Sequence, residues 1–174
     1  DPATQVKAWG GGLYSCSMVL QSGWYGGAGT VYLKTAGSTN GKLFAIQRPT
    51  SNIATPTTLL PYVGTGNVGT VTPDTTVPSD LWIEPQSSTA YFPVGSVGLW
   101  LRIAGTDYRV LAEQADRRHL LLQGAAGFVG TGDAYAGVYK FDAVTVNGQF
   151  TLQTNDVVEP GTVTLAGGAQ FVHP

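Results

Sequence analysis

The sequence of 174 residues is short of charged side chains. Only 11% of its residues are Asp, Glu, Lys or Arg, against about 25% in an average soluble domain. Nine Lys and Arg against 11 Asp and Glu leave a net charge of −2, too small for strong repulsion between copies. Arg117 and Arg118 are the one adjacent pair of cations, and Asp116 precedes them. Because binding to nucleic acid needs a clustered basic face, the composition argues against such a partner.

Cysteine, histidine and long hydrophobic runs are also scarce. The single Cys16 cannot form an internal disulfide, and with only two His the chain is poor in metal ligands, so we expect no metal and no cofactor. Leu13 to Leu20 alternates apolar and polar residues, which predicts a half-buried strand with Cys16 as a core thiol. No run approaches the about 20 apolar residues of a membrane helix, so we expect no membrane partner.

What the chain has in abundance is glycine, with 24 Gly and 10 Pro. Short apolar alternation interrupted by Gly, Pro and Asn is typical of an all-β sandwich or barrel. We predict an antiparallel β-sandwich or small β-barrel of about ten short strands with long Gly, Thr and Pro-rich loops. Residues 1–174 form one predicted domain with no internal repeat, in which 1–12 are an N-terminal arm and 48–79 a long extended loop.

Several strand pairs can be predicted from local signals. Residues 30–34 and 42–47 flank a turn-rich segment and predict a hairpin. Residues 97–123 predict three consecutive antiparallel strands, with a helix over 110–122 as the competing interpretation. Tyr135, Gly137, Tyr139 and Phe141 alternate along a further strand.

The last part of the chain carries three turn signals. Val146-Asn147-Gly148 predicts a three-residue hairpin loop that sets Val144 opposite Phe150. Glu159-Pro160-Gly161-Thr162 predicts a type II turn with Gly161 at positive φ. Gly167-Gly168 predicts a break between two short strands.

Residues suited to catalysis are few and lack supporting motifs. His119 follows Asp116-Arg117-Arg118, but no nucleophile motif such as G-x-S-x-G accompanies it. The acidic residues are scattered and most fall in predicted turns, where Asp bonds to nearby backbone. Gly130 to Asp133 is a weak calcium candidate. We therefore expect no enzymatic activity, and a hydrolase that uses His119 is the alternative.

Aromatic residues are the better candidates for binding. Trp24 and Tyr25 stand in a glycine-rich segment, where exposed rings can anchor a protein interface, stack on sugars or fold back onto the core. Arg117 and Arg118 are further interface candidates. Trp82 and Trp100 lie in apolar strands and are expected to pack against the core.

The composition of the chain combines high Gly and Thr with few charged residues and almost no Cys, Met or His. It also includes threonine-proline-rich segments. In this it resembles accessory structural proteins of virions, especially bacteriophage capsid decoration (cement) proteins. The resemblance implies a β-domain on the outer capsid surface that contacts the major capsid protein or other virion proteins. It also implies a homo-oligomer, such as a trimer. The alternatives are another phage head or tail subunit, and a secreted carbohydrate-binding β-domain that uses Trp24 and Tyr25.

Overall fold

A computed structural model describes residues 29–47 and 56–174 of the chain. These residues form fourteen β-strands and no helix, so the predicted all-β class is confirmed. Their contacts divide the chain into two compact units, each built from segments that are distant in sequence. No helix among the described residues is long and apolar enough to cross a membrane.

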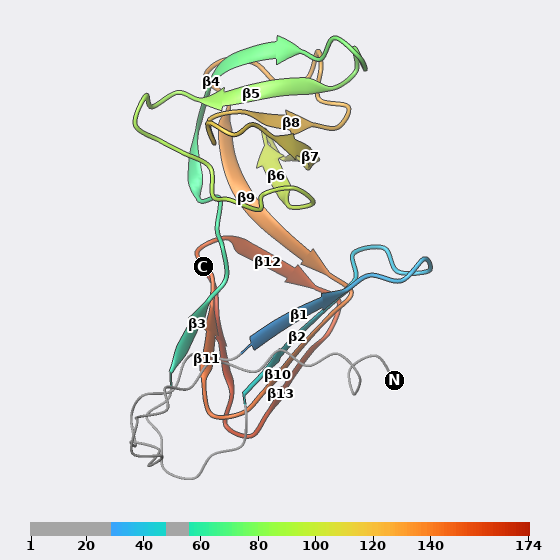
Figure 1. The fold of residues 1–174 in the computed structure, drawn as a ribbon, viewed down its shortest axis with the longest axis vertical. Coiled ribbons are helices and arrows are strands. Elements are labelled where there is room, and N and C mark those ends of the chain that lie inside the picture. The colour runs from blue at the N-terminus through green and yellow to red at the C-terminus, as the bar shows by residue number, and fades with distance from the viewer. Residues whose placement is uncertain (1–28, 48–55) are drawn as a thin grey trace, which may run out of the picture. The chain divides into compact units, whose positions relative to one another are not determined.

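The first unit, here called the barrel unit, comprises Pro61–Lys140 and Asn155–Val158. Six antiparallel strands follow one another around it in the order β9, β4, β5, β8, β7, β6, and β6 pairs again with β9 to close the barrel (Figure 1). β12 adds to the outside of β9. The bounds are β4 (Thr65–Pro73), β5 (Leu81–Pro85), β6 (Trp100–Ile103), β7 (Thr106–Glu113), β8 (Leu120–Leu122), β9 (Ala134–Phe141) and β12 (Val157–Pro160).

Alternating apolar residues fill the barrel, as the sequence pattern predicts. Leu101 and Ile103 of β6 and Val110 of β7 are almost fully buried in one core cluster. The strands β6, β7 and β8 pair consecutively and antiparallel, so the predicted three-stranded meander is confirmed and the competing helix is wrong. The two-residue turn between β6 and β7 is Ala104-Gly105, both at positive φ, which matches the right-handed twist of a hairpin.

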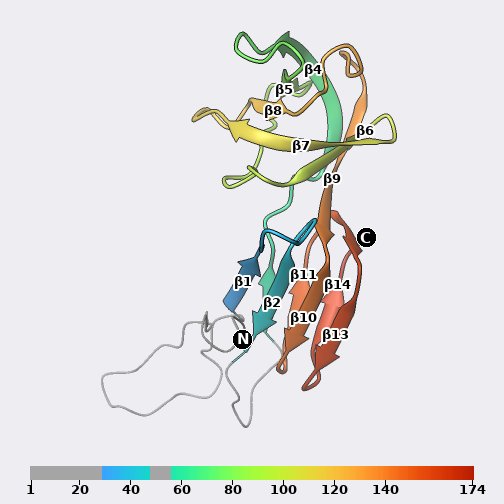
Figure 2. The ribbon, with the colours of Figure 1, turned by 90° about the vertical axis from the view of Figure 1, so that its right-hand side faces the viewer.

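The second unit, here called the two-sheet unit, includes the described residues up to Leu60, Phe141–Thr154 and Glu159–His173. One sheet has the order β1, β2, β10, β13 and the other the order β14, β11, β3 (Figure 2). The bounds are β1 (Gly29–Leu33), β2 (Lys42–Ile46), β3 (Thr57–Leu59), β10 (Ala143–Asn147), β11 (Thr151–Gln153), β13 (Val163–Ala166) and β14 (Gln170–Val172). β1 and β2 form the predicted antiparallel hairpin.

The other strands of the two-sheet unit form three rungs, each a strand in one sheet followed along the chain by a strand in the other. The rungs are β2 with β3, β10 with β11, and β13 with β14. They stack in parallel and in register: β10 lies between β2 and β13, and β11 lies between β3 and β14. The prediction of uniformly antiparallel sheets is therefore wrong for this unit.

The predicted hairpin at Asn147-Gly148 is also wrong. Gly148 has positive φ as expected, but β10 and β11 pair with other rungs and belong to different sheets. Val144 of β10 and Phe150, directly before β11, are both fully buried. The chain turns through an arc that carries it from one sheet to the other, and this buries the same apolar residues that a hairpin would have placed on one face.

The last two rungs also form a short internal repeat, against our expectation of none. Val144 pairs with Val163 and Leu152 with Phe171, so each residue lies 19 positions from its partner in the next rung. The sequence signal is the recurrence of Val-Thr followed three residues later by Gly, at Val144 to Gly148 and at Val163 to Gly167. The predicted break at Gly167-Gly168 is confirmed, with both glycines at positive φ.

Two further expectations are corrected. The long loop predicted over residues 48–79 contains β3 and the whole of the long strand β4. Residues 48–55, the arm 1–12 and the strand predicted over Leu13 to Leu20 lie outside the described residues. Gly161 is absent from the positive-φ residues, so the type II turn is wrong. Glycine is required there because a Cβ would lie 2.6 Å from the carbonyl oxygen of Asp142. The interpretation of 1–174 as one domain stays a prediction.

Candidate functional site

The predicted interface residues Arg117 and Arg118 lie in the connection between β7 and β8 of the barrel unit, where they meet Tyr91. The guanidinium carbons of Arg117 and Arg118 lie 5.7 Å and 6.0 Å from the centre of the Tyr91 ring. Tyr91 is 57% exposed, which is high for a large aromatic residue. We call these three residues the arginine–tyrosine patch. The other predicted binding residues, Trp24 and Tyr25, lie outside the described residues.

Backbone hydrogen bonds fix the two segments of the patch together. The Phe92 N–H donates to the carbonyl oxygen of Arg117 over 2.8 Å. Phe92 is buried in the barrel core, whereas the side chain of Tyr91 beside it is exposed. Arg117 has φ of 58°, a left-handed conformation held by the turn from Gln114, whose carbonyl oxygen accepts from the Arg117 N–H. The patch is therefore positioned by the barrel itself.

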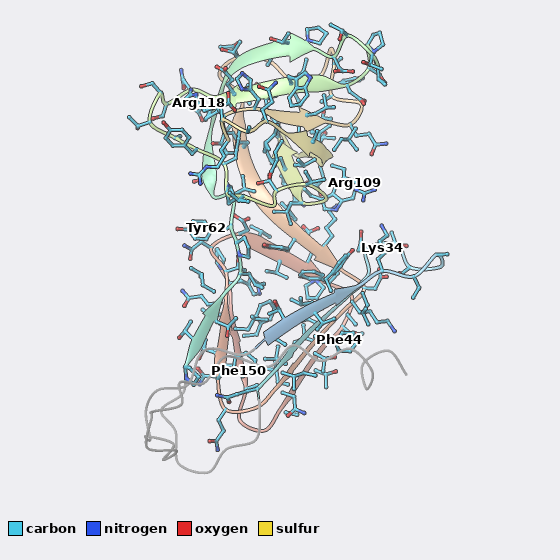
Figure 3. All side chains as sticks on the ribbon, viewed as in Figure 1. Lys34, Phe44, Tyr62, Arg109, Arg118 and Phe150 are labelled. Atoms are coloured by element: carbon cyan, nitrogen blue, oxygen red, sulfur yellow. The ribbon has the colours of Figure 1, made fainter. Side chains whose placement is uncertain are left out.

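The two arginines of the patch differ in how they are bound. Arg118 donates from Nη1 to the carbonyl oxygen of Ser88 over 2.6 Å, which ties it to the loop before Tyr91. The guanidinium of Arg117 has no hydrogen bond or ion pair within the described part of the chain, and the residue is exposed. Arg118 is thus anchored to the neighbouring loop, while Arg117 presents donors that a partner can use. Figure 3 shows Arg118 at the edge of the barrel unit.

His119 lies next to the patch and contacts two carboxylates, one on β5 and one in the connection between β7 and β8. Its Nε2 contacts Oε1 of Glu84 on β5, and its Nδ1 lies 2.8 Å from Oδ2 of Asp116. The Asp116 carboxylate also accepts from the Arg118 N–H, and this bond together with the one to His119 lowers the pKa of Asp116. Asp116 is therefore engaged by His119 and by backbone, which leaves the guanidinium of Arg117 without an acidic neighbour in the turn.

Three further acidic residues accept from loop backbone, but only Asp133 does so within its own turn, as the turn interpretation predicts, whereas Glu113 and Asp142 bond to segments far away in the sequence. Glu113 accepts from the N–H groups of Gly95 and Ser96, Asp142 from those of Asn40 and Gly41, and Asp133 from that of Gly130. Asp133 thus closes its own turn in the weak calcium candidate Gly130 to Asp133. Among residues 29–47 and 56–174, no three His, Cys, Asp or Glu side chains form a group that could hold a metal ion.

Asp156 is the most deeply buried of these acceptors. It is 2% exposed, and its two oxygens accept from the N–H groups of Val63 and Gly64, each over 2.7 Å. Gly137 leaves it room, since a Cβ there would lie 2.4 Å from the carboxyl carbon. Burial raises the pKa of Asp156, although the two amide hydrogen bonds act in the opposite direction. Burial, with the nearby Asp156, also raises the pKa of Tyr139.

Sequence reasoning found the arginines but missed Tyr91. Tyr91 lies far from Arg117 in sequence, between a Ser and Thr cluster and Pro93, and nothing local indicates that the two segments meet. Trp82 and Trp100 are only partly buried in β5 and β6 and are not among the residues packed against the barrel core, so the expectation of core packing is wrong. The Trp82 indole N–H donates to Asp74, and Lys140 Nζ lies 4.8 Å from the centre of the Trp100 ring. Comparison with protein-family models, with curated proteins and with solved structures gave no match.

Proposed function

We propose that this chain is a structural protein of a virus particle, a capsid decoration protein that binds neighbouring capsid subunits on the outer surface. The observation that carries the proposal is the arginine–tyrosine patch. An exposed ring with two guanidinium groups close to it is the kind of residue set that dominates protein interfaces, where Tyr and Arg are enriched. The scarcity of charge elsewhere supports it, because a neutral polar surface can lie against a repeated lattice without repulsion.

The patch indicates the chemistry of its partner surface. Arg117 offers planar donors that match a carboxylate, and the exposed face of Tyr91 offers apolar area. A capsid surface with an acidic residue beside an apolar one would satisfy both. Many copies on a symmetric particle would then convert modest single contacts into tight overall binding.

The proposal is tested by mixing the purified chain with particles that lack their decoration protein and measuring how much chain sediments with them. Replacing Tyr91 or Arg117 by Ala should weaken binding about tenfold or more, the range of interface hot spots. The matched control is Arg109→Ala, because Arg109 is also exposed on the barrel unit, away from Arg118 (Figure 3). Equal binding by Y91A, R117A and R109A would refute the role of the patch, and binding to tails in place of capsids would identify a different virion subunit.

A further inference from the structure

The rung formed by β13 and β14 is at the end of the stack in the two-sheet unit. β13 pairs only with β10, and β14 only with β11, among residues 29–47 and 56–174. At the opposite end of its sheet, β2 is covered by the antiparallel strand β1. Figure 2 shows β13 as the outermost strand of the row β1, β2, β10, β13. The stack therefore ends in an open edge, formed by β13 and β14.

Apolar columns of the core run into this open edge. Leu43, Val144 and Val163 are neighbours across three strands, and Ala45, Val146 and Leu165 form a second column. The members on β2 and β10 are buried, whereas Val163 is 44% and Leu165 48% exposed. The inward face of β13 therefore carries apolar side chains like those of a core strand, but these side chains are exposed.

The backbone of β13 also has N–H and C=O groups available for pairing with a further strand. The Val144 N–H donates to the carbonyl oxygen of Thr162, and the Gly148 N–H to that of Ala166. Backbone groups along a strand point alternately to its two sides, so Val163 and Leu165 direct their N–H and C=O groups away from β10. Within the described part of the chain, these groups have no strand to bond to.

β13 and β14 are short, but they lack three common protections against edge pairing. Natural edge strands are blocked by charged side chains, proline or bulges. From Gly161 to Val172 the sequence contains no charged residue and no proline, and β13 pairs with β10 without a bulge. Two such edges would meet without charge repulsion.

We propose that the open edge is a dimerisation surface, on which β13 pairs antiparallel with β13 of a second copy about a twofold axis through Thr164. In this register Val163 faces Leu165 of the second copy, and Leu165 faces its Val163. Antiparallel strands alternate hydrogen-bonded and non-hydrogen-bonded pairs. The two outward-directed residues of each copy thus form the hydrogen-bonded pairs, and Thr164 forms the non-hydrogen-bonded pair between them.

This register is selected by both backbone and side chains. A shift of the pairing by one residue would place the outward-directed N–H and C=O groups of one copy opposite N–H and C=O groups that already bond to β10 in the other copy. It would also place apolar side chains opposite polar ones. The symmetric register joins the β13-containing sheet of one copy to the same sheet of the second copy. Each apolar column then continues into the second copy, and Val163 of one copy becomes the cross-strand neighbour of Leu165 of the other. A twofold contact uses the same surface on both partners, and so it closes on itself without forming fibres. The dimer goes beyond the proposed function and does not depend on it.

Disulfide trapping tests the register. In a Cys16→Ser background, Thr164→Cys should form a covalent dimer on mild oxidation, because a non-hydrogen-bonded pair has Cα atoms about 4.5 Å apart, within disulfide range. Thr162→Cys is the matched control, since it would face Ala166 of the second copy and has no thiol to meet. Covalent dimer with T164C and not with T162C is the expected result. Equal trapping of the two variants would overturn the register.

Sedimentation velocity tests the association itself. The unmodified chain should sediment as a dimer, and Val163→Lys should make it monomeric at the same concentration by placing a charge in the paired row. The control is Val97→Lys, because Val97 is 53% exposed on the barrel unit and the substitution is the same. Thermal unfolding of both variants checks that they fold. A chain that stays monomeric at all concentrations, or an edge taken up by a different protein, would overturn the proposal.

Discussion

The two hydrogen bonds to the Asp156 carboxylate lead to a quantitative prediction for the barrel unit. Asp156→Ala would leave the N–H groups of Val63 and Gly64 without their acceptor in a site that is almost closed to solvent. Each buried donor left unsatisfied costs about 1–3 kcal/mol. Removal of a buried charge returns part of this, because burial disfavours the ionised form of Asp156. We expect the free energy of unfolding to fall by about 2–4 kcal/mol.

Asp74 provides the matched control. Its carboxylate also accepts from two backbone N–H groups, those of Thr76 and Val77, in an exposed turn where water can take its place. It accepts in addition from the indole N–H of Trp82, so the urea midpoint of Asp74→Ala is confirmed by circular dichroism. Asp74→Ala should therefore lower the free energy of unfolding much less than Asp156→Ala. Asp156→Asn keeps one acceptor oxygen and should fall between the two.

The assay is urea unfolding followed by tryptophan fluorescence, since Trp82 and Trp100 both lie in barrel strands. We expect the order D156A, D156N, D74A from least to most stable. A loss for D156A no larger than that for D74A would show that burial of the two donors is not what makes Asp156 important.

Two further predictions concern the pH dependence and the core of the two-sheet unit. Asp107 is bonded by Arg102 over 2.7 Å and by Lys140 over 2.6 Å, and the hydrogen bond from Arg102 is the main cause of its lowered pKa. Its stabilising contribution is present above the ordinary Asp pKa of about 3.9 and is lost as the pH falls through the lowered value. Urea unfolding below pH 4 should therefore show a shallower loss of stability for Asp107→Asn than for the unmodified chain, and parallel curves would contradict this. Phe150 is fully buried, so Phe150→Ala should lower the free energy of unfolding by about 3–5 kcal/mol. Leu59→Ala, at an exposed site of the same unit, should change the urea midpoint little by circular dichroism, and similar losses for the two variants would refute the assigned core.

The sequence was most informative where contacts are local. The meander β6 to β8 could be predicted because its strands follow one another and alternation marks the buried face of each. The acidic residues could be assigned to turns for a similar reason, since Asp74, Asp116 and Asp133 bond to backbone only two or three residues away. Such interactions join residues that are close in sequence, and so they can be predicted from one sequence.

The stack of rungs shows where this information ends. The alternation of apolar and polar residues in β2, β10 and β13 indicates which residues face inward. It does not indicate which strands are neighbours in the sheet. Leu43 and Val144 become neighbours across about a hundred residues of intervening chain. The turn signal at Asn147-Gly148 is equally compatible with a hairpin and with an arc between sheets, because both need a glycine at positive φ.

The sequence by itself determined the all-β class, the positions of most turns and the neutral character of the surface, because each of these follows from composition and short-range pattern. Only the tertiary structure decided the parallel stacking, the open edge at β13 and the meeting of Tyr91 with Arg117 and Arg118. These features join segments far apart in the chain. Which of these segments become neighbours depends on which apolar faces pack together, and this is decided only when the whole chain folds.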